Sequence, residues 1–316
     1  MAGELINQNN QVQFGPALLM GPGTGYVVTR AGIEGWEDLP GFDSTDVPRP
    51  ASHGSWPGSR YLNPRIVTVD VSIHPDNDPA GRSGLALKRA LDLATRPDAA
   101  EAELAVRVLG ETLMCRARIN SRVPQALSTQ WMAMGELGVP LQFIATDPRR
   151  YSLDEHSLMA GPPTRSEGLQ YTLLSGADRI DYAPSGGVDR FDWGVDGNVG
   201  DITVTNAGTE DSPPVITFFG PCTTPSVLLQ SDAADDLVLE YDITLAVGDT
   251  LTLDARAGTV LLNAGSSDAD RAYLVTPRSG LLEELLLPPG DSQLSFRQQS
   301  TDTSSSMTVT WRDAYM

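Results

Sequence analysis

Residues 237–253 read LVLEYDITLAVGDTLTL, and this stretch decides the fold of the second half of the chain. Leu237, Leu239 and Tyr241 fall on every second position, so they share one face of an extended strand. The Gly-Asp pair at 248–249 forms a tight turn, after which the apolar residues resume with the same spacing. Two strands joined by a turn, each with one apolar face, predict antiparallel β-structure.

The same alternation continues on both sides of this stretch. Apolar residues recur at every second position in Leu294–Phe296 and in Met307–Trp311, and turn residues separate such runs about every 8–12 positions. This pattern is typical of a β-sandwich or barrel. We therefore predict a C-terminal β-sandwich domain over residues 201–316. Residues 151–200 are rich in Gly, Pro, Ser and Asp without a sustained period, so we predict a linker with irregular strands there.

Residues 1–150 predict a separate α+β domain. Between Ile66 and Ile73 the apolar residues alternate, which indicates a strand with one buried face. Residues 83–95 carry apolar side chains at helical spacing and Pro97 ends this segment, so we predict one helix there. Further strands are expected at 102–109, 113–119 and 139–145. A sheet crossed by one helix is an α+β layer, and the fold class of the whole chain is mainly β.

Residues 39–64 form a long polar stretch with five prolines, which exclude a helix and a central strand. A connection of this length is usually functional or disordered. Trp36 precedes it and Trp56 lies in it; these side chains could anchor an interface or simply pack in a core or loop. His53 fits a structural hydrogen bond as well as a role as ligand or base. We predict an interface here that comprises Trp36, Arg49, His53, Trp56, Tyr61 and Arg65.

The charge is unevenly distributed between the two halves. Residues 1–150 hold 14 Lys and Arg against 16 Asp and Glu, a net charge of −2, whereas residues 151–316 hold 8 Arg against 25 Asp and Glu, a net charge of −17. An acidic half repels phosphate groups and anionic lipid surfaces, so we expect neither nucleic-acid binding nor membrane association. We also expect no secretory signal and no membrane-spanning helix.

The sequence shows no set of catalytic residues. The three histidines are scattered and none has the spacing of a zinc-hydrolase motif. The segment Gly21–Gly25 has glycines at alternate positions but lacks the Lys-Ser/Thr pair of a phosphate loop. Cys115 and Cys222 are about a hundred residues apart, and we predict two buried free thiols rather than a disulfide or zinc site. We therefore predict no enzymatic activity and no cofactor.

Short acidic runs in predicted loops leave one question open. Asp232, Asp235 and Asp236, and separately Asp268 and Asp270, supply oxygen ligands that could hold Ca²⁺. Neither run has the spacing of an EF-hand, so solvated loops explain them as well. We predict no metal site.

The chain resembles the distal tail protein family of long-tailed phages. The resemblance covers nearly the whole length, and its strength lies in the order and spacing of landmarks that are individually short. These landmarks are Pro48-Arg49, His53-Gly54, Tyr61-Leu62, Arg65–Val69, Phe143–Tyr151, Asn206–Thr209, Pro214–Gly220, Leu251–Asp254, Pro288–Gly290 and Trp311–Met316.

This resemblance implies a structural component of the virion at the tail tip, assembled in the cytoplasm of the bacterial host. The N-terminal domain would form a ring, usually of six copies, stacked between the tail tube protein and the baseplate hub or tail-fibre proteins. The tape measure protein is a further candidate neighbour. The C-terminal domain would be a galectin-like β-sandwich, and we expect its acidic copies to lie apart at the periphery of the ring.

Two other functions remain open on the sequence alone. The β-sandwich could be a carbohydrate- or receptor-binding module of the tail tip, which would require exposed aromatic side chains on one platform. A tail-associated hydrolase would require a pair of opposed carboxylates. The sequence places neither arrangement, and oligomeric state and glycan binding would distinguish the first alternative from a ring-forming connector.

Overall fold

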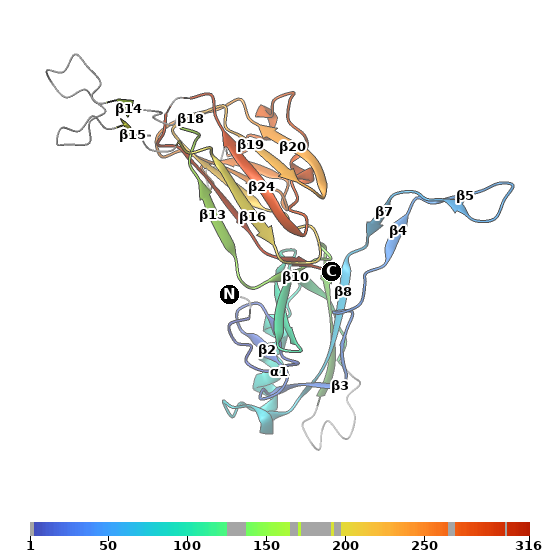
Figure 1. Cartoon of the computed structure of the whole chain (residues 1–316). Coiled ribbons are helices and arrows are strands. Elements are labelled where there is room, and N and C mark those ends of the chain that lie inside the picture. Colours follow the sequence, from blue (N-terminus) through green and yellow to red (C-terminus); the bar gives the residue numbers. More distant parts are fainter. Residues whose placement is uncertain are drawn as a thin grey trace, which may run out of the picture. The chain divides into compact units, whose positions relative to one another are not determined.

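The computed structural model describes residues 3–124, 137–164, 170–171, 191–192, 197–264, 269–300 and 302–316. The chain forms two compact units (Figure 1). The first comprises Met1–Asp154 together with Asp313–Met316, and the second comprises Glu155–Arg312. The chain therefore passes between the units twice.

The first unit is built on one antiparallel sheet with the strand order β2-β1-β9-β10-β11-β8-β3. The predicted alternation in the strand Arg65–Ile73 is confirmed, because Val67, Val69, Val71 and Ile73 are all buried. The three other strands predicted in this half are also present. The strands are β1 (Val12–Phe14), β2 (Leu18–Met20), β3 (Tyr26–Glu34), β8 (Arg65–Ile73), β9 (Ala102–Val108), β10 (Glu111–Arg122) and β11 (Leu137–Ala145), with β12 (Arg150–Ser152) and β26 (Ala314–Tyr315) attached through β10.

The predicted helix is α1 (Gly84–Ala94), the one α-helix in the part of the chain that the structure describes. It begins where the Ser83 hydroxyl accepts a hydrogen bond from the backbone N–H of Ala86, which satisfies an N-terminal donor. Leu87 and Leu91 are fully buried in the core formed with the sheet. A short 3₁₀ turn, η1 (Pro75–Asn77), lies between β8 and this helix.

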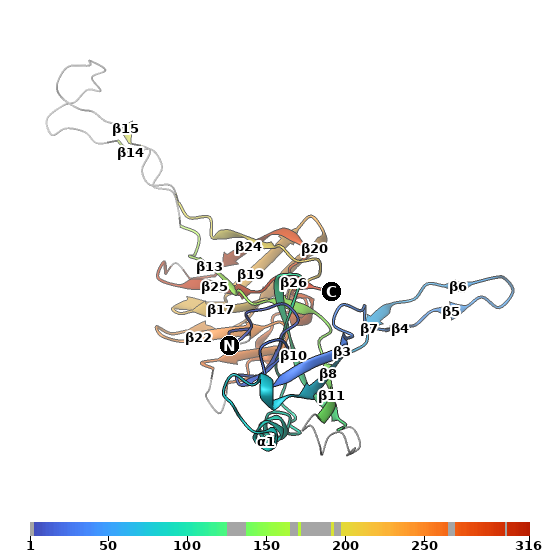
Figure 2. The same ribbon diagram turned by 90° about the horizontal axis from the view of Figure 1, so that it is seen from below.

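Residues 42–62 form a two-stranded ribbon, called the arm below, that projects from the sheet between β3 and β8 (Figures 1 and 2). Its base pairs β4 (Phe42–Ser44) with β7 (Arg60–Leu62), and its outer part pairs β5 (Val47–Pro48) with β6 (Ser55–Trp56). The prolines are compatible with this structure, because an isolated ribbon leaves one edge of each strand unpaired.

The second unit is built on two larger antiparallel sheets with the orders β13-β25-β17-β22-β23 and β16-β24-β19-β20, and it also has the two-stranded pairs β14-β15 and β18-β21. The inward side chains of the larger sheets share one apolar core, in which the rings of Phe218 and Phe296 lie 5.6 Å apart. The predicted mainly β fold with a sandwich is thus confirmed. The elements are β13 (His156–Ala160), β14 (Gln170–Tyr171), β15 (Phe191–Asp192), β16 (Asp201–Asn206), β17 (Val215–Phe219), β18 (Cys222–Thr223), β19 (Ser226–Ser231), β20 (Ala234–Glu240), β21 (Thr244–Leu245), β22 (Thr250–Asp254), β23 (Thr259–Leu262), η2 (Ala272–Leu274), η3 (Leu282–Glu284), β24 (Gly290–Arg297) and β25 (Ser306–Trp311).

The division of the chain differs from the sequence expectation at two places. The predicted linker over 151–200 begins with residues of β12 and continues into β13, which pairs with β25. β13 has only one fully buried residue, Ala160, so it carries no visible alternation. The last residues, Asp313–Met316, belong to the first unit. Most of the predicted linker, residues 165–169, 172–190 and 193–196, lies outside the described residues.

Candidate interaction surface

The arm is exposed on both faces. From Phe42 to Leu62 every residue is exposed except Asp46 and Leu62, which are half-buried. Large apolar side chains are among them: Phe42, Val47, Trp56 and Tyr61 are between 48% and 66% exposed. A single two-stranded ribbon is marginally stable in water, and this one has no layer beneath it. The arm is therefore a surface suited to contact with another chain.

Local contacts organise the arm along its length. Val47 is paired directly with Trp56, and the Arg49 guanidinium lies 5.8 Å from the centroid of the Trp56 ring. Asp46 accepts a hydrogen bond of 2.7 Å from the backbone N–H of Gly58. This bond lowers the pKa of the Asp46 carboxyl. Together these contacts explain how the ribbon keeps its register without a core.

Four of the six predicted interface residues lie on the arm and are exposed: Arg49, His53, Trp56 and Tyr61. Trp36 and Arg65 do not lie on the surface, since they are 2% and 1% exposed. Trp36 packs in the core of the first unit, and the Arg65 side chain is enclosed by the backbone carbonyls of other segments. The interface prediction therefore stays with the four arm residues, to which the structure adds Phe42 and Val47.

The guanidinium of Arg65 is held almost entirely by backbone carbonyls. Its Nη1 donates to the carbonyls of Trp36 and Asp38 at 2.8 Å, and its Nε donates to that of Pro148 at 2.7 Å. Burial lowers the pKa of Arg65, and the neighbouring positive charge of Arg150 adds to this effect. The cost of burying this charge is offset by hydrogen bonds, as a buried charge requires.

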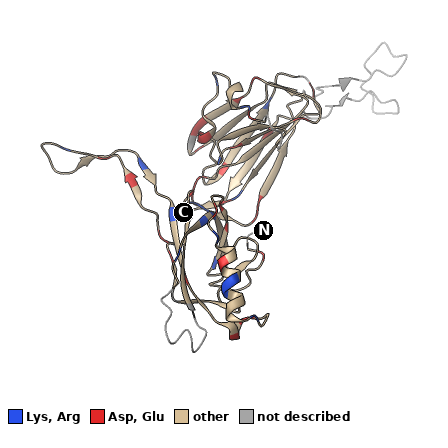
Figure 3. Ribbon diagram, turned by 180° about the vertical axis from the view of Figure 1, so that it is seen from behind, with Lys and Arg blue, Asp and Glu red and all other residues tan. Residues whose placement is uncertain are grey.

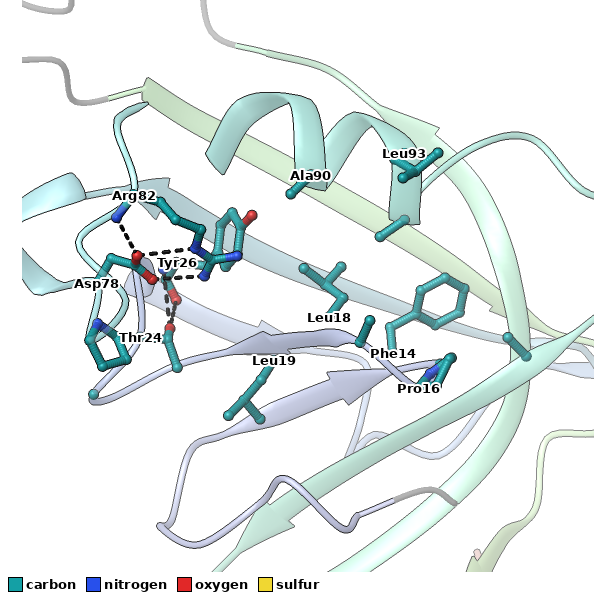
Figure 4. A pocket seen from close by; sticks show the side chains of 16 residues that line it. Phe14, Pro16, Leu18, Leu19, Thr24, Tyr26, Asp78, Arg82, Ala90 and Leu93 are labelled. Atoms are coloured by element: carbon teal, nitrogen blue, oxygen red, sulfur yellow. Dashed lines mark hydrogen bonds and ion pairs between the residues drawn. The ribbon is translucent and has the colours of Figure 1, made fainter. Parts of the chain in front are cut away.

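An apolar groove lies beside α1 in the same unit (Figure 4). Its volume is about 510 Å³, and apolar side chains of the β1–β2 hairpin and of α1 line it, Phe14, Leu18 and Leu93 among them. Leu93 is 66% exposed, so the groove has an open apolar wall. Such a groove can receive apolar side chains of another chain.

An ion pair closes one end of the groove. Asp78 accepts hydrogen bonds from the backbone N–H of Arg82 at 2.7 Å and from its guanidinium at 2.7 and 3.0 Å. Hydrogen bonding by Arg82 holds the pKa of the Asp78 carboxyl below its usual range, and the same bonds raise the pKa of Arg82. The pair fixes the loop before α1 rather than offering a free charge.

The described residues bring no cluster of metal ligands together, and both thiols are buried. Among these residues no group of three or more His, Cys, Asp or Glu could hold a metal ion. Cys115 and Cys222 are free and buried, and burial raises the pKa of their thiols to about 12 and about 11. Of the acidic loops, Asp232 and Asp235 are exposed, whereas Asp268 lies outside the described residues.

Two further features bear on the alternatives. In the described part of the second unit the exposed aromatic side chains are Phe219 on β17 and Tyr273 on η2, so no single element presents two or three of them. None of the helices in the described ranges has both the length and the apolar character that crossing a bilayer requires. A carbohydrate platform is therefore not visible in the described residues.

Comparison with solved structures gives the fold an independent reference. The chain matches the crystal structure of the phage SPP1 Dit protein (gp 19.1), described as a paradigm of the hub adsorption apparatus in phages that infect Gram-positive bacteria, with a TM-score of 0.54. The match covers 92% of this chain and 94% of that one at 13% identity. Over nearly its whole length the chain shares the fold of a phage hub protein.

Two structures of the phage P2 baseplate in its activated conformation, with Ca and with Sr, give TM-scores of 0.48 and 0.49. Each matches at 10% identity over 95% of this chain and 97% of the other. No protein-family model matches the sequence, and no curated protein matches it either. At these identities the likeness concerns the fold.

The sequence did not indicate Arg150 or the groove. Arg150 is buried, although it lies in a run of polar residues, and its contacts come from segments far apart in the chain. The groove is formed by two hairpin strands and a helix that are separated by more than sixty positions. The sequence selected Arg49, His53, Trp56 and Tyr61 of the proline-rich stretch, which are exposed on the arm.

Proposed function

We infer that this protein is a structural component of a phage tail, a hub at the distal end that joins the tail tube to baseplate hub or tail-fibre proteins. In this role, residues 1–150 form a closed ring of identical copies, six as in the ring that the family resemblance implies. The arm is the observation that carries this proposal, because it is an exposed ribbon with four large apolar side chains, Phe42, Val47, Trp56 and Tyr61, that nothing in the described chain covers. The fold likeness to the SPP1 hub protein supports the same role.

The size of the arm fits a stable interface. It presents about 20 exposed residues, as many as one side of a standard protein–protein interface contributes. Aromatic and arginine side chains, the types enriched where interfaces gain most of their energy, recur along it as Trp56, Tyr61, Arg49 and Arg60. Charges of both signs lie on the arm (Figure 3), so its approach to the near-neutral half of a second copy is not opposed.

A closed ring requires two different, complementary surfaces on each copy. The arm is one, and we assign the second to the groove beside α1. The arm joins the sheet at one end of β8, at Arg65. The loop that leads to α1 and the groove begins after the other end of β8, at Ile73. Nine residues of strand span roughly 30 Å, so contact between arm and groove is expected between copies rather than within one.

The charge distribution supports the placement of the second unit. Residues 151–316 carry a net charge of −17, and copies of it close together would repel within a Debye length of about 8 Å at physiological salt. The near-neutral first half tolerates close contact between copies. The acidic units therefore lie apart at the periphery, and the ring itself comes from residues 1–150.

The proposed role requires no cofactor and no catalysis. Its partners are further copies of the chain, the tail tube protein, the baseplate hub or fibre proteins and, as a further candidate neighbour, the tape measure protein. Its place is the tail tip of the virion, reached by assembly in the bacterial cytoplasm.

Native mass spectrometry and electron microscopy of the purified protein test the ring. A closed oligomer of uniform size is expected, alone or with the tail tube protein. A chain that remains monomeric at high concentration, with no ring in images in either condition, would contradict the proposal.

Disulfide trapping tests the contact between arm and groove. Trp56→Cys on one chain and Leu93→Cys on another are mixed and oxidised. A cross-linked dimer of the two variants is expected, with little background because Cys115 and Cys222 are buried. Each variant alone serves as the control. If rings form but this cross-link does not, the proposal of a ring is kept and the proposal that the arm binds the groove is wrong.

A further inference from the structure

The root of the arm, Gly35–Asp38, is fixed to the sheet at several points. Gly35 has a φ of +79°, and a Cβ there would lie 2.0 Å from the backbone oxygen of Ile66, so the root passes directly over β8. The next residue, Trp36, is buried in the core of the unit. The first strand of the arm begins four residues after this segment, so the root sets where that strand leaves the sheet.

Arg65 ties this root to two other segments. Its guanidinium binds the carbonyls of Gly35, Trp36 and Asp38 at 3.1, 2.8 and 2.8 Å. The same group reaches the Pro148 carbonyl at 2.7 Å and lies 3.8 Å from the sulfur of Met316. Arg65 is also the first residue of β8, directly after the second strand of the arm and a two-residue connection. One residue therefore joins the two attachments of the arm: its backbone continues the second strand, and its side chain holds the root.

Arg150 holds the root from the other side. Its Nη1 lies 2.8 Å from the Glu37 carboxylate, and its guanidinium stacks on the Trp36 ring at 5.7 Å from the centroid. Its Nη2 donates to the backbone oxygen of Met316. Met316 follows β26, which pairs with β12, the strand that begins with Arg150. The two arginines thus contact the same two segments, the root and Asp313–Met316.

We propose that Arg65 and Arg150 act as positioning residues, a clamp that sets the direction in which the arm leaves the sheet. A ribbon without a core takes its direction only from its two attachments. One is β8, which is fixed inside the sheet; the other is the root, which the clamp holds. Without the clamp the arm pivots about the end of β8.

This inference rests on the proposed function in one respect, the consequence for assembly. If the arm makes the contact between copies, only molecules with the correctly directed arm can bind. The apparent dissociation constant rises in inverse proportion to the fraction of such molecules. An arm that is correctly directed about one tenth of the time would raise it about tenfold.

The motion of the arm in the monomer tests the clamp directly. A spin label is attached to Ser52→Cys at the exposed end of the arm; the native cysteines are buried and stay unlabelled. Spectra are recorded in dilute, monomeric protein with the native root, with Arg65→Lys and with Arg150→Lys. The matched control is Arg116→Lys, which changes an exposed arginine on β10, outside the arm, its root and the groove.

Faster label motion is expected in both clamp variants and unchanged motion in the control. Thermal melts identify a variant that fails to fold, and Arg150→Lys then carries the test, because it leaves the carbonyl contacts of Arg65 in place. A folded clamp variant whose label is as immobile as in the native protein would overturn the inference, since a purely stabilising role lowers the melting temperature without moving the label.

Assembly is measured separately, by the protein concentration at which rings form. The clamp variants are expected to need about tenfold more protein than the control. If the native protein forms no ring but the label moves faster in the variants, the proposed function fails and the clamp stands. If rings form and the label in the variants stays immobile, the function stands and the clamp fails.

Discussion

The arm and the hairpin of β22 and β23 are both antiparallel strand pairs, but only the hairpin continues into a larger sheet and packs on a core. In β22 the side chains of Leu251 and Leu253 are fully buried, and the strand is covered by the opposite sheet. In the arm the directly paired Val47 and Trp56 are 56% and 51% exposed. Similar local pairing therefore gives one element whose apolar side chains are buried within the chain and one whose apolar side chains stay exposed.

The difference shows that strand pairing alone does not stabilise an element in water. Burial of apolar surface supplies most of the stabilisation, at about 25 cal/mol per Å². The sandwich gains this within its own chain, whereas the arm can gain it only from another molecule. Substitutions should therefore change folding in one region and association in the other.

The largest effect is expected in the sandwich core. Phe218→Ala removes a fully buried ring that packs against Phe296, and the free energy of unfolding should fall by about 3–5 kcal/mol. Phe219→Ala is the matched control, because this neighbour on β17 points the other way and is 38% exposed. Its cost should be about 1 kcal/mol or less. Equal losses in denaturant titrations would break the comparison.

The next effect concerns association. Trp56→Ala should weaken self-association about tenfold or more, roughly 1.4 kcal/mol, because it removes an aromatic anchor from the arm. The free energy of unfolding of the monomer should change by no more than about 0.5 kcal/mol. Leu109→Ala, at a 94% exposed position in the turn between β9 and β10, is the control for loss of a surface apolar group. Sedimentation at several protein concentrations measures the self-association of both variants. If Trp56→Ala destabilised the monomer and left self-association normal, Trp56 would belong to the folding of the chain and not to the interface.

The loop before α1 is held within its own chain by the ion pair of Asp78 and Arg82, so its stability, unlike the association of the arm, should depend on pH. The folded-state pKa of Asp78 is lowered, chiefly by hydrogen bonding from Arg82. Its contribution to stability is therefore present above the unfolded pKa of about 3.9 and is lost as the pH falls through the lower folded value. Asp78→Asn should lower the melting temperature at pH 7, and the difference from the native protein should vanish near pH 2. A difference that stays constant over this range would show that the charge is not responsible.

The smallest effect is expected at the exposed face of α1. Lys88 and Asp92 form an ion pair of 2.7 Å one helical turn apart, and both side chains are more than a third exposed. Lys88→Gln should cost no more than about 0.5 kcal/mol, and high salt should reduce this further. Melts at low and high salt measure it. A loss of several kcal/mol would mean that this face is covered within the folded chain.

Several elements were predictable because their signal is local. The strand β8 and the helix α1 each carry their period within about ten consecutive residues, and both are present near the expected bounds. The strand β13 lies in residues 151–200, where we predicted a linker with irregular strands; four of its five side chains are exposed or half-buried and show no alternation. β13 is defined by its pairing with β25 and not by a pattern of its own. Such a strand cannot be recognised from its sequence.

The candidate surface was predictable in part for the same reason. Exposed Arg49, His53, Trp56 and Tyr61 lie in the proline-rich stretch that the sequence excluded from helices and central strands. Trp36 and Arg65 carry the same chemical signals, yet they are buried. An aromatic or arginine residue is equally suited to a core contact and to an interface, so residue type alone could not separate the two groups.

The sequence by itself determined the mainly β character, the single long helix and the contrast in charge between the two halves, since periodicity and composition involve neighbours in the chain. The tertiary structure alone decided that Arg65 binds the carbonyls of Trp36 and Pro148 and that Met316 lies beside it. It also decided that the arm has no covering layer. These contacts join segments up to about 250 positions apart, and their energies depend on burial, which exists only once the chain has folded.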